Sequence, residues 1–283
     1  MLAQIDWSRP WYDAVRAAGA GLGGPDASGA SVAAMLNRAA APLATALVNQ
    51  RGQPIRFVAQ DALPDGQAYE AFIGATGSVP TRDNLHDFFN GLVWLTFPRI
   101  KLQLNALQAA QIALAGVGKS RGPARDGATI FDENAALLVV REGAEGQALV
   151  AALRAHDWQG ALYQRRALFA SVEGQARSQA QVWLFGHALM EKLVAPRKAI
   201  TAHTRVIVAP GHYFALAHDA QRAWIDACVA AQLAADGLST AGFTPLPVLG
   251  VPGWWPDQDQ DFYNDSSVFR PKRAALVDNR ERT

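Results

Sequence analysis

The strongest structural signal in the sequence is the run from Asp83 to Phe97. At about 100° per residue, its large apolar side chains cover one side of a helix. Four polar side chains form one narrow stripe on the other side, namely Asp83, His86, Asp87 and Asn90. Pro98 follows the run and ends or bends the helix. We therefore expect a helix that packs against a core and presents a small polar stripe.

The polar stripe has two interpretations. A carboxylate beside an imidazole fixes the tautomer of the ring and raises its basicity, which suits a general base or a metal ligand. In that case His86 and Asp87 act on a substrate. Alternatively, Asp87 only pairs with His86 in a structural network. In both cases we expect Asp83 to cap the helix, because a carboxylate at this end can accept the free backbone N–H groups.

A second polar pair lies in the apolar run 182–193. A helix that is apolar nearly all round is normally buried, so we expect a buried helix over residues 176–193. His187 and Glu191 are four residues apart, and their side chains therefore meet on one face of this helix. A buried Glu191 needs a partner, which is His187, an arginine from elsewhere or a metal ion.

At this spacing His187 and Glu191 can both reach one divalent cation, which makes them candidate metal ligands. Two ligands are too few for a metal site, and the sequence leaves the cofactor unknown. The missing ligands come from one of two pairs: His86 with Asp87, or Asp132 with Glu133. The alternative is a buried His–Glu pair that ties two helices together and binds nothing.

The pattern over the whole chain predicts a mainly helical fold. The 283 residues are half hydrophobic and rich in alanine, which favours helix. Helices are predicted at 6–18, 31–49, 83–97, 99–115, 146–155, 160–172, 176–193 and 219–235. Strands are predicted at 52–58 and 205–209, and a buried strand is predicted within 128–140, at 137–140. We therefore expect a single α+β domain over residues 1–283, predominantly helical with a few short strands. The C-terminal segment 243–283 is expected to wrap the surface.

Composition and charge exclude several classes of protein. The net charge is +1 and only 18% of the residues are charged, which argues against a nucleic-acid binder. Cys228 is the only cysteine, so a disulfide framework and a cysteine-based zinc cluster are excluded. No apolar stretch is long enough to span a membrane, and the N-terminus shows no signal peptide. We therefore predict a cytoplasmic protein without nucleic-acid or membrane partners.

Several sequence blocks form a specific combination. They are RDNLHDFFNGLVW (82–94) with FPR (97–99), DEN (132–134), FGHALMEK (185–192), PGWW (252–255), FYND (262–265) and VFRP (268–271). This combination resembles a proteobacterial family of domains of unknown function, over roughly residues 83–273. The resemblance implies a bacterial origin and one full-length domain. It carries no established activity, so it does not decide the chemistry.

The polar residues of the two apolar helices favour an enzyme, and a hydrolase in particular. The predicted catalytic residues are His86, Asp87, His187 and Glu191. His86 or Glu191 would act as general base on water, with or without a divalent metal. The residues expected to contact a small-molecule substrate are Asn90, Arg99, Lys101 and Trp254. Of these, Arg99 or Lys101 is expected to bind an anionic group.

The alternative is a non-catalytic binding or interaction protein. Trp254 and Trp255 would then form an exposed aromatic platform on which a ligand stacks. The same pair can instead fill the core beneath a surface segment, and the exposure of the two indoles separates these cases. An oligomeric scaffold is a third interpretation.

Overall fold

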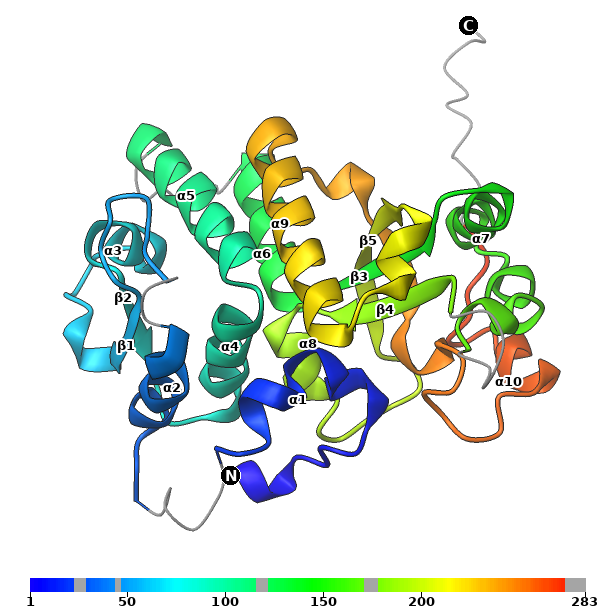
Figure 1. Cartoon of the computed structure of the whole chain (residues 1–283), viewed down its shortest axis with the longest axis horizontal. Coiled ribbons are helices and arrows are strands. Elements are labelled where there is room, and N and C mark those ends of the chain that lie inside the picture. Colours follow the sequence, from blue (N-terminus) through cyan, green and yellow to red (C-terminus); the bar gives the residue numbers. More distant parts are fainter. Residues whose placement is uncertain (23–28, 44–46, 116–121, 171–177, 273–283) are drawn as a thin grey trace, which may run out of the picture.

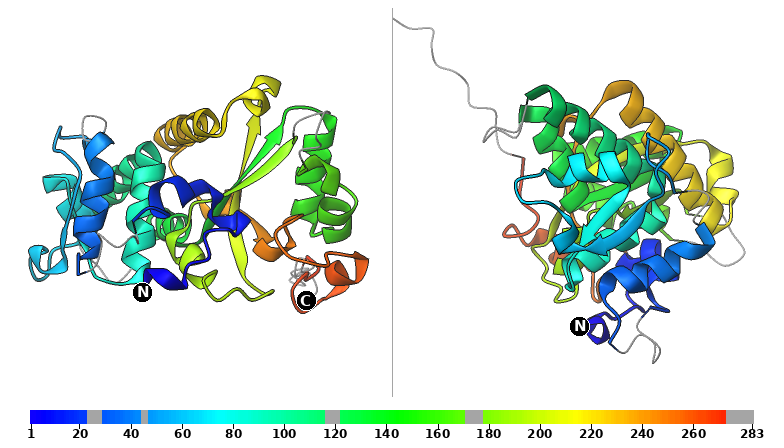
Figure 2. Two further views of the ribbon diagram at one scale, coloured as in Figure 1. Left: turned by 60° about the horizontal axis from the view of Figure 1, so that its bottom comes forward. Right: turned by 90° about the vertical axis from the view of Figure 1, so that its left-hand side faces the viewer.

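The computed structural model describes residues 1–22, 29–43, 47–115, 122–170 and 178–272 (Figure 1). Within these ranges the protein is an α+β, mostly helical domain with two small sheets, which confirms the predicted fold class. The larger sheet lies between two groups of helices of unequal size (Figure 2).

The four-stranded sheet forms around an apolar central strand. Its order is β4 (Ala180–Leu184), β3 (Ala135–Arg141), β5 (Thr201–Ala209) and β6 (Thr244–Pro247). Strands β3 and β5 are parallel, and the two outer pairs are antiparallel. Leu137 and Val139 face the larger core, whereas Leu138 and Val140 face the smaller one. Both faces of β3 are covered, which explains its uninterrupted apolar sequence.

Helices cover both faces of this sheet. Helix α7 (Ala144–Ala155) covers the face with the smaller core, as the left view of Figure 2 shows. It buries Leu149 and Leu153 there. The helices of the larger core are α1 (Asp13–Gly19), α2 (Val32–Ala40), α4 (Leu85–Thr96), α5 (Pro98–Ala115), α6 (Gly122–Asn134), α8 (His187–Lys192) and α9 (His218–Asp236). The small parallel sheet, β1 (Arg56–Ala59) with β2 (Ser78–Thr81), lies beside α3 (Tyr69–Thr76) at the far end of the molecule (Figure 1).

The run 83–97 forms helix α4, as predicted, but its cap differs from the expected one. Asn84 caps the helix, because its Oδ1 accepts a hydrogen bond from the Asp87 backbone N–H at 2.8 Å. The Asp83 carboxylate instead accepts from the backbone N–H of Val32, the first residue of α2, at 2.7 Å. The prediction that Asp83 caps its own helix is therefore wrong, since it caps a neighbouring one.

The largest error of the sequence analysis concerns residues 176–193. Residues 180–184 form strand β4, and the helix after it, α8, spans only His187–Lys192. Val182 and Trp183 take part in the pairing with β3, so the apolar run is a buried strand followed by a buried helix turn. A short apolar run is compatible with either element, and only the presence of a partner strand decides between them.

Other elements differ mainly at their ends. The strand predicted at 137–140 is part of β3, which begins at Ala135, directly after helix α6 ends at Asn134. The helix predicted at 31–49 stops at Ala40, and the one predicted at 6–18 begins at Asp13. The helix predicted at 160–172 is a π-helical turn (Gln159–Tyr163) and a short 3₁₀ turn (Arg166–Leu168). Residues 171–177, at the junction of two predicted helices, lie outside the described part.

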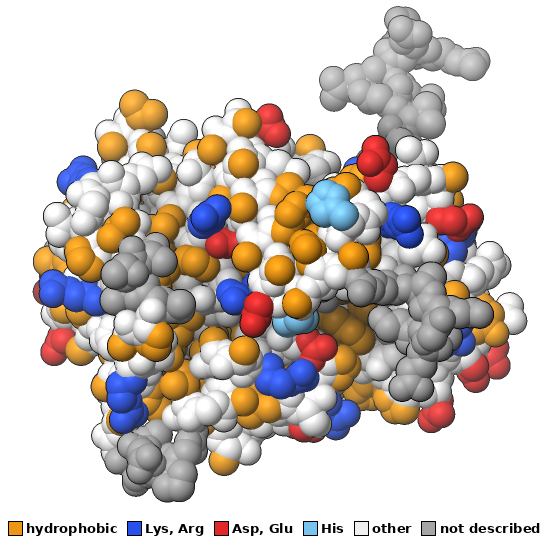
Figure 3. All heavy atoms as spheres, viewed as in Figure 1, with side chains coloured by type: hydrophobic (Ala, Val, Ile, Leu, Met, Phe, Trp, Pro, Cys, Tyr) orange, Lys and Arg blue, Asp and Glu red, His pale blue; other side chains and the backbone are white. Residues whose placement is uncertain are grey.

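The C-terminal segment begins inside the fold. Strand β6 pairs with β5, and Val248 and Leu249 are buried in the larger core. Helix α10 (Gln260–Asn264) packs against the π-helical turn after α7. On the face drawn in Figure 3, acidic and basic side chains are interspersed among neutral and apolar ones. Among the described residues, none of the helices combines the length and the apolar character needed to cross a membrane.

Candidate functional site

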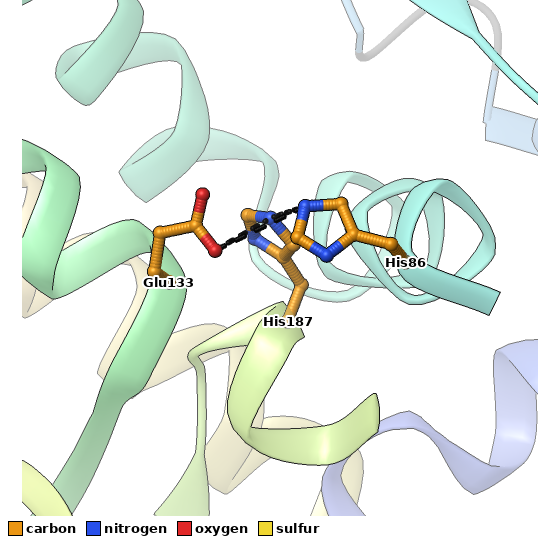
Figure 4. A group of neighbouring side chains, drawn as sticks. All are labelled: His86, Glu133 and His187. Carbon is orange, nitrogen blue, oxygen red and sulfur yellow. Dashed lines mark hydrogen bonds and ion pairs between the residues drawn. The ribbon is translucent and has the colours of Figure 1, made fainter. Parts of the chain in front are cut away.

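Two histidines and a glutamate from three different helices meet at one point (Figure 4). His86 comes from the first turn of α4, Glu133 from the last turn of α6, and His187 is the first residue of α8. The two Nε2 atoms are 3.1 Å apart. Glu133 Oε2 lies 3.6 Å from His187 Nε2 and 3.9 Å from His86 Nε2. The structure therefore brings together two histidines that are far apart in the sequence.

Gly186 allows His187 to approach α6. The Gly186 N–H donates to the Ala135 carbonyl oxygen at 2.8 Å, at the junction of α6 and β3. A Cβ atom at this position would lie 2.5 Å from the Ala135 nitrogen and 2.6 Å from the Asn134 Cα. These contacts are with backbone, which cannot rotate away. Only glycine fits here without displacing His187 from Glu133.

We expect Gly186→Ala to destabilise the protein by about 1–3 kcal/mol, because the added methyl group overpacks the backbone of the neighbouring junction. Urea denaturation measures this loss. The matched control is Gly242→Ala, where a Cβ would meet nothing within 4 Å. Equal stability of the two variants would show that the junction adapts to a side chain.

Each imidazole has a carboxylate behind it. Glu191 Oε2 lies 2.9 Å from His86 Nδ1, and Asp132 Oδ2 lies 3.9 Å from His187 Nδ1. A carboxylate only accepts hydrogen bonds, so the His86 proton sits on Nδ1 and its Nε2 carries a lone pair. The predicted contact between His187 and Glu191 is not formed, because Glu191 reaches across to the other helix instead.

The facing nitrogens leave a pairing problem. If His187 Nε2 donates to His86, then the buried His187 Nδ1 is a bare acceptor beside Asp132, and it makes no hydrogen bond to the described residues. If His187 is instead protonated on Nδ1, two lone pairs and the Glu133 carboxylate face one another. Both problems disappear when a positive charge lies between the rings, either a second proton on His86 or a metal ion.

The distances accommodate either a proton or a metal ion between the rings. A proton between the rings leaves Glu133 Oε2 at 3.6 and 3.9 Å, beyond hydrogen-bonding distance of both nitrogens. With sides of 3.1, 3.6 and 3.9 Å, the triangle of ligand atoms has an in-plane point about 2.1 Å from all three, a distance close to the bonds of zinc to His nitrogen and carboxylate oxygen. Glu191 then occupies the place of the carboxylate that usually orients a metal-bound histidine, whereas Asp132, at 3.9 Å from His187 Nδ1, is too far away to form that hydrogen bond.

Burial controls the protonation of the cluster. It lowers the pKa of His187 to about 4, although the nearby Asp132 carboxylate opposes the shift. The ring is therefore neutral at pH 7, and neutral imidazole is the form that binds a metal. Burial raises the pKa of Glu133. Burial also acts to raise the pKa of Asp132. The attraction of Lys101 and His187 for the carboxylate is stronger than this effect and holds the pKa of Asp132 below its usual value.

Lys101, a buried lysine on α5, organises the hydrogen bonds on one side of the cluster. Lys101 is 4% exposed and donates to Asp132 Oδ1 at 2.6 Å and to Asn90 Oδ1 at 2.8 Å. This orients the Asn90 amide, whose Nδ2 donates to the Tyr69 hydroxyl oxygen at 3.1 Å. The Tyr69 proton has no acceptor among the described residues. Tyr69 therefore keeps a hydrogen-bond donor for a bound molecule.

A pocket of about 490 Å³ adjoins the cluster, which is a volume that suits a small molecule. Besides the cluster, its polar lining residues are Gln60, Tyr69, Glu70, Arg82, Asp87, Asn90, Gln108, Thr129 and Asp132. Arg82 binds both carboxylate oxygens of Asp87, at 3.0 and 3.1 Å. Asp87 thus borders the pocket as half of an ion pair and does not contact His86.

Six of the eight residues predicted for the site lie at or near this pocket. They are His86, Asp87, Asn90, Lys101, His187 and Glu191. Arg99 lies elsewhere: its side chain is exposed, and its backbone N–H donates to Asp226. Trp254 lines a separate pocket of about 220 Å³ with Trp183 and His218. Neither residue lines the pocket beside the cluster.

Several pocket residues were not predicted from the sequence. Asp132 and Glu133 were considered only as one of two ligand pairs, and Tyr69, Glu70, Arg82 and Gln108 were not considered. Tyr69 and Glu70 begin α3, a helix that the sequence analysis did not identify. Arg82 does carry a signal, since it directly precedes the polar stripe of α4.

The two tryptophans are partly buried. Both Trp254 and Trp255 pack against the hydrophobic core, which is the geometry of a core-filling pair. This arrangement gives less support to a platform for ligand stacking, and binding at these residues stays a prediction.

The fold and the cluster together define an α+β, mostly helical protein in which two histidines and a carboxylate converge beside a pocket. The family model described as "Protein of unknown function (DUF3025)" matches residues 55–273, and the chain belongs to this family. The match extends the region of resemblance toward the N-terminus, whereas bacterial origin stays a prediction. No curated protein and no solved structure matches the chain.

Proposed function

We propose that this protein is a hydrolase that activates water with a divalent metal ion bound by His86, Glu133 and His187. The observation that carries the proposal is the meeting of three ligand atoms around one point, with a carboxylate behind each imidazole. Three protein ligands with a further position for water are typical of catalytic zinc sites, whereas structural zinc sites have four protein ligands.

The proposal assigns new roles to two predicted catalytic residues. Glu191 does not act as a base on water, because it holds His86 through Nδ1 and is a positioning residue. Asp87 holds Arg82 at the pocket wall. His86 and His187 are metal ligands.

The reaction we propose is the cleavage of an ester or amide. A zinc-bound water has a pKa near 7, so hydroxide is available at neutral pH. Held by His86, Glu133 and His187, the metal ion would supply hydroxide for attack on the carbonyl carbon. The C–O or C–N bond would then break, and the proton released by the water would pass to the leaving oxygen or nitrogen. The free Tyr69 hydroxyl donates to the carbonyl oxygen as negative charge develops there.

The test is the metal content of protein purified without a His-tag. We expect about one zinc, manganese or cobalt ion per chain, measured by inductively coupled plasma mass spectrometry. A chelator should remove the ion and lower the melting temperature, since a ligand at a thousand times its Kd stabilises the folded state by about 4 kcal/mol. Hydrolysis of p-nitrophenyl esters or p-nitroanilides should disappear with the ion and return when it is added back.

Absence of metal, together with no thermal shift on adding zinc, manganese or cobalt, would overturn the proposal. Metal-independent hydrolysis would also contradict it, because the activity would then come from acid–base chemistry of the side chains alone.

A further inference from the structure

The charged groups around the pocket are unevenly paired. Four carboxylates line it, those of Glu70, Asp87, Asp132 and Glu133. Asp87 is paired with Arg82, and Asp132 with Lys101. Glu133 faces the two imidazoles and is assigned to the metal. Apart from Glu133, Glu70 is the one lining carboxylate without a Lys or Arg partner within 4.0 Å among the described residues.

Glu70 is nevertheless held in place. It lies in the first turn of α3, and its Oε2 accepts a hydrogen bond from Asn105 Nδ2 at 2.6 Å. The same amide donates to the Glu70 backbone oxygen at 2.9 Å. The other carboxylate oxygen accepts no hydrogen bond within the described part of the chain. Glu70 therefore presents unused acceptor capacity at the wall of the pocket.

An uncompensated carboxylate in such a place is unfavourable. Burial raises the pKa of Glu70 despite the opposing effect of Lys101. A ligand cation would offset the loss of hydration and supply the missing N–H donors. A second metal ion is a poor match, because a single carboxylate beside an amide nitrogen offers too few oxygen ligands.

We infer that the pocket selects substrates that carry an ammonium or guanidinium group, which Glu70 binds. This inference about the substrate rests on the proposed function. The neighbouring Tyr69 offers a donor, so the two side chains together match a molecule with a carbonyl oxygen and a cationic group. The substrate class is thus an ester or amide with a positively charged substituent.

The test compares three probes of similar size that carry a positive, no and a negative charge: n-butylammonium, n-butanol and n-butyrate. Calorimetry at fixed ionic strength gives their Kd values, with and without added zinc. We expect the cation to bind the wild-type protein at least about tenfold more tightly than the other two. Glu70→Gln should remove this preference, because the amide keeps the size and can still accept from Asn105 but carries no charge.

The control variant is Glu145→Gln, which neutralises an exposed glutamate on α7 and should keep the wild-type preference. Tighter binding of butyrate than of the cation, or an unchanged preference in Glu70→Gln, would overturn the inference. The zinc content separates this result from the proposed function. If Glu70→Gln binds metal and keeps the wild-type probe affinities, only the inferred substrate class is wrong. If the protein binds no metal but still binds the cation through Glu70, only the proposed hydrolase function is wrong.

Discussion

Replacing His86 or His187 by alanine is expected to abolish stoichiometric metal binding. Each substitution removes one of three ligand atoms and leaves two, with water filling the gap. Loss of an orienting carboxylate alone typically weakens metal affinity by about 10–100-fold, so loss of a ligand should weaken it by more than about 100-fold. Competition with a chromogenic chelator measures the Kd, and the hydrolytic rate should fall with metal occupancy.

Two further variants make this result specific. His212→Ala removes an exposed histidine and should bind metal like the wild type. Glu191→Gln removes the charge behind His86 and should give an intermediate affinity. Retention of wild-type affinity by His187→Ala, in a variant that still unfolds cooperatively, would rule out the site. The unfolding curve distinguishes a missing ligand from a collapsed fold.

Replacing Lys101 by methionine is expected to cost about 3–5 kcal/mol of stability. Lys101 is buried, and the substitution leaves the Asp132 carboxylate as a buried charge without its partner. Methionine preserves much of the apolar stem, so the loss is mainly electrostatic and includes the cation–π contact of Lys101 Nζ, which lies 5.2 Å from the centroid of the Trp94 ring. Urea denaturation at neutral pH measures the change in the free energy of unfolding.

The double variant Lys101→Met with Asp132→Asn should recover part of this loss, because it removes the orphaned charge as well. Lys192→Met, at an exposed position of α8, serves as the control and should change stability by less than about 0.5 kcal/mol. A loss below about 1 kcal/mol in Lys101→Met would mean that water enters and hydrates Asp132.

Local patterns predicted long elements well. The helices expected at 83–97, 99–115 and 219–235 correspond to α4, α5 and α9, and the strand at 205–209 is part of β5. In each case the spacing of apolar residues, or a terminal glycine or proline, is sufficient to predict the element. Helical and extended periodicity depend on the geometry of the element itself, so no distant partner is needed. The polar stripe of α4 was visible for the same reason.

Pairings between elements were not predictable in this way. The run 182–193 is equally apolar as a helix or as a strand, and only pairing with β3 makes Val182 and Trp183 part of a sheet. This change also altered the site. His187 became the first residue of a short helix, and Glu191, expected beside it, contacts His86.

The sequence by itself determined that few polar and ionisable groups would lie among many apolar ones, and that His86, Asn90, Lys101 and His187 would be among them. Tertiary structure alone decided their partners. Glu133, Asp132 and Tyr69 reach the site from α6 and α3, through contacts between segments far apart in the chain. Periodicity reports which face of an element is polar. Periodicity carries no information about which other polar face this face meets, because the pairing of faces depends on the packing of the whole core.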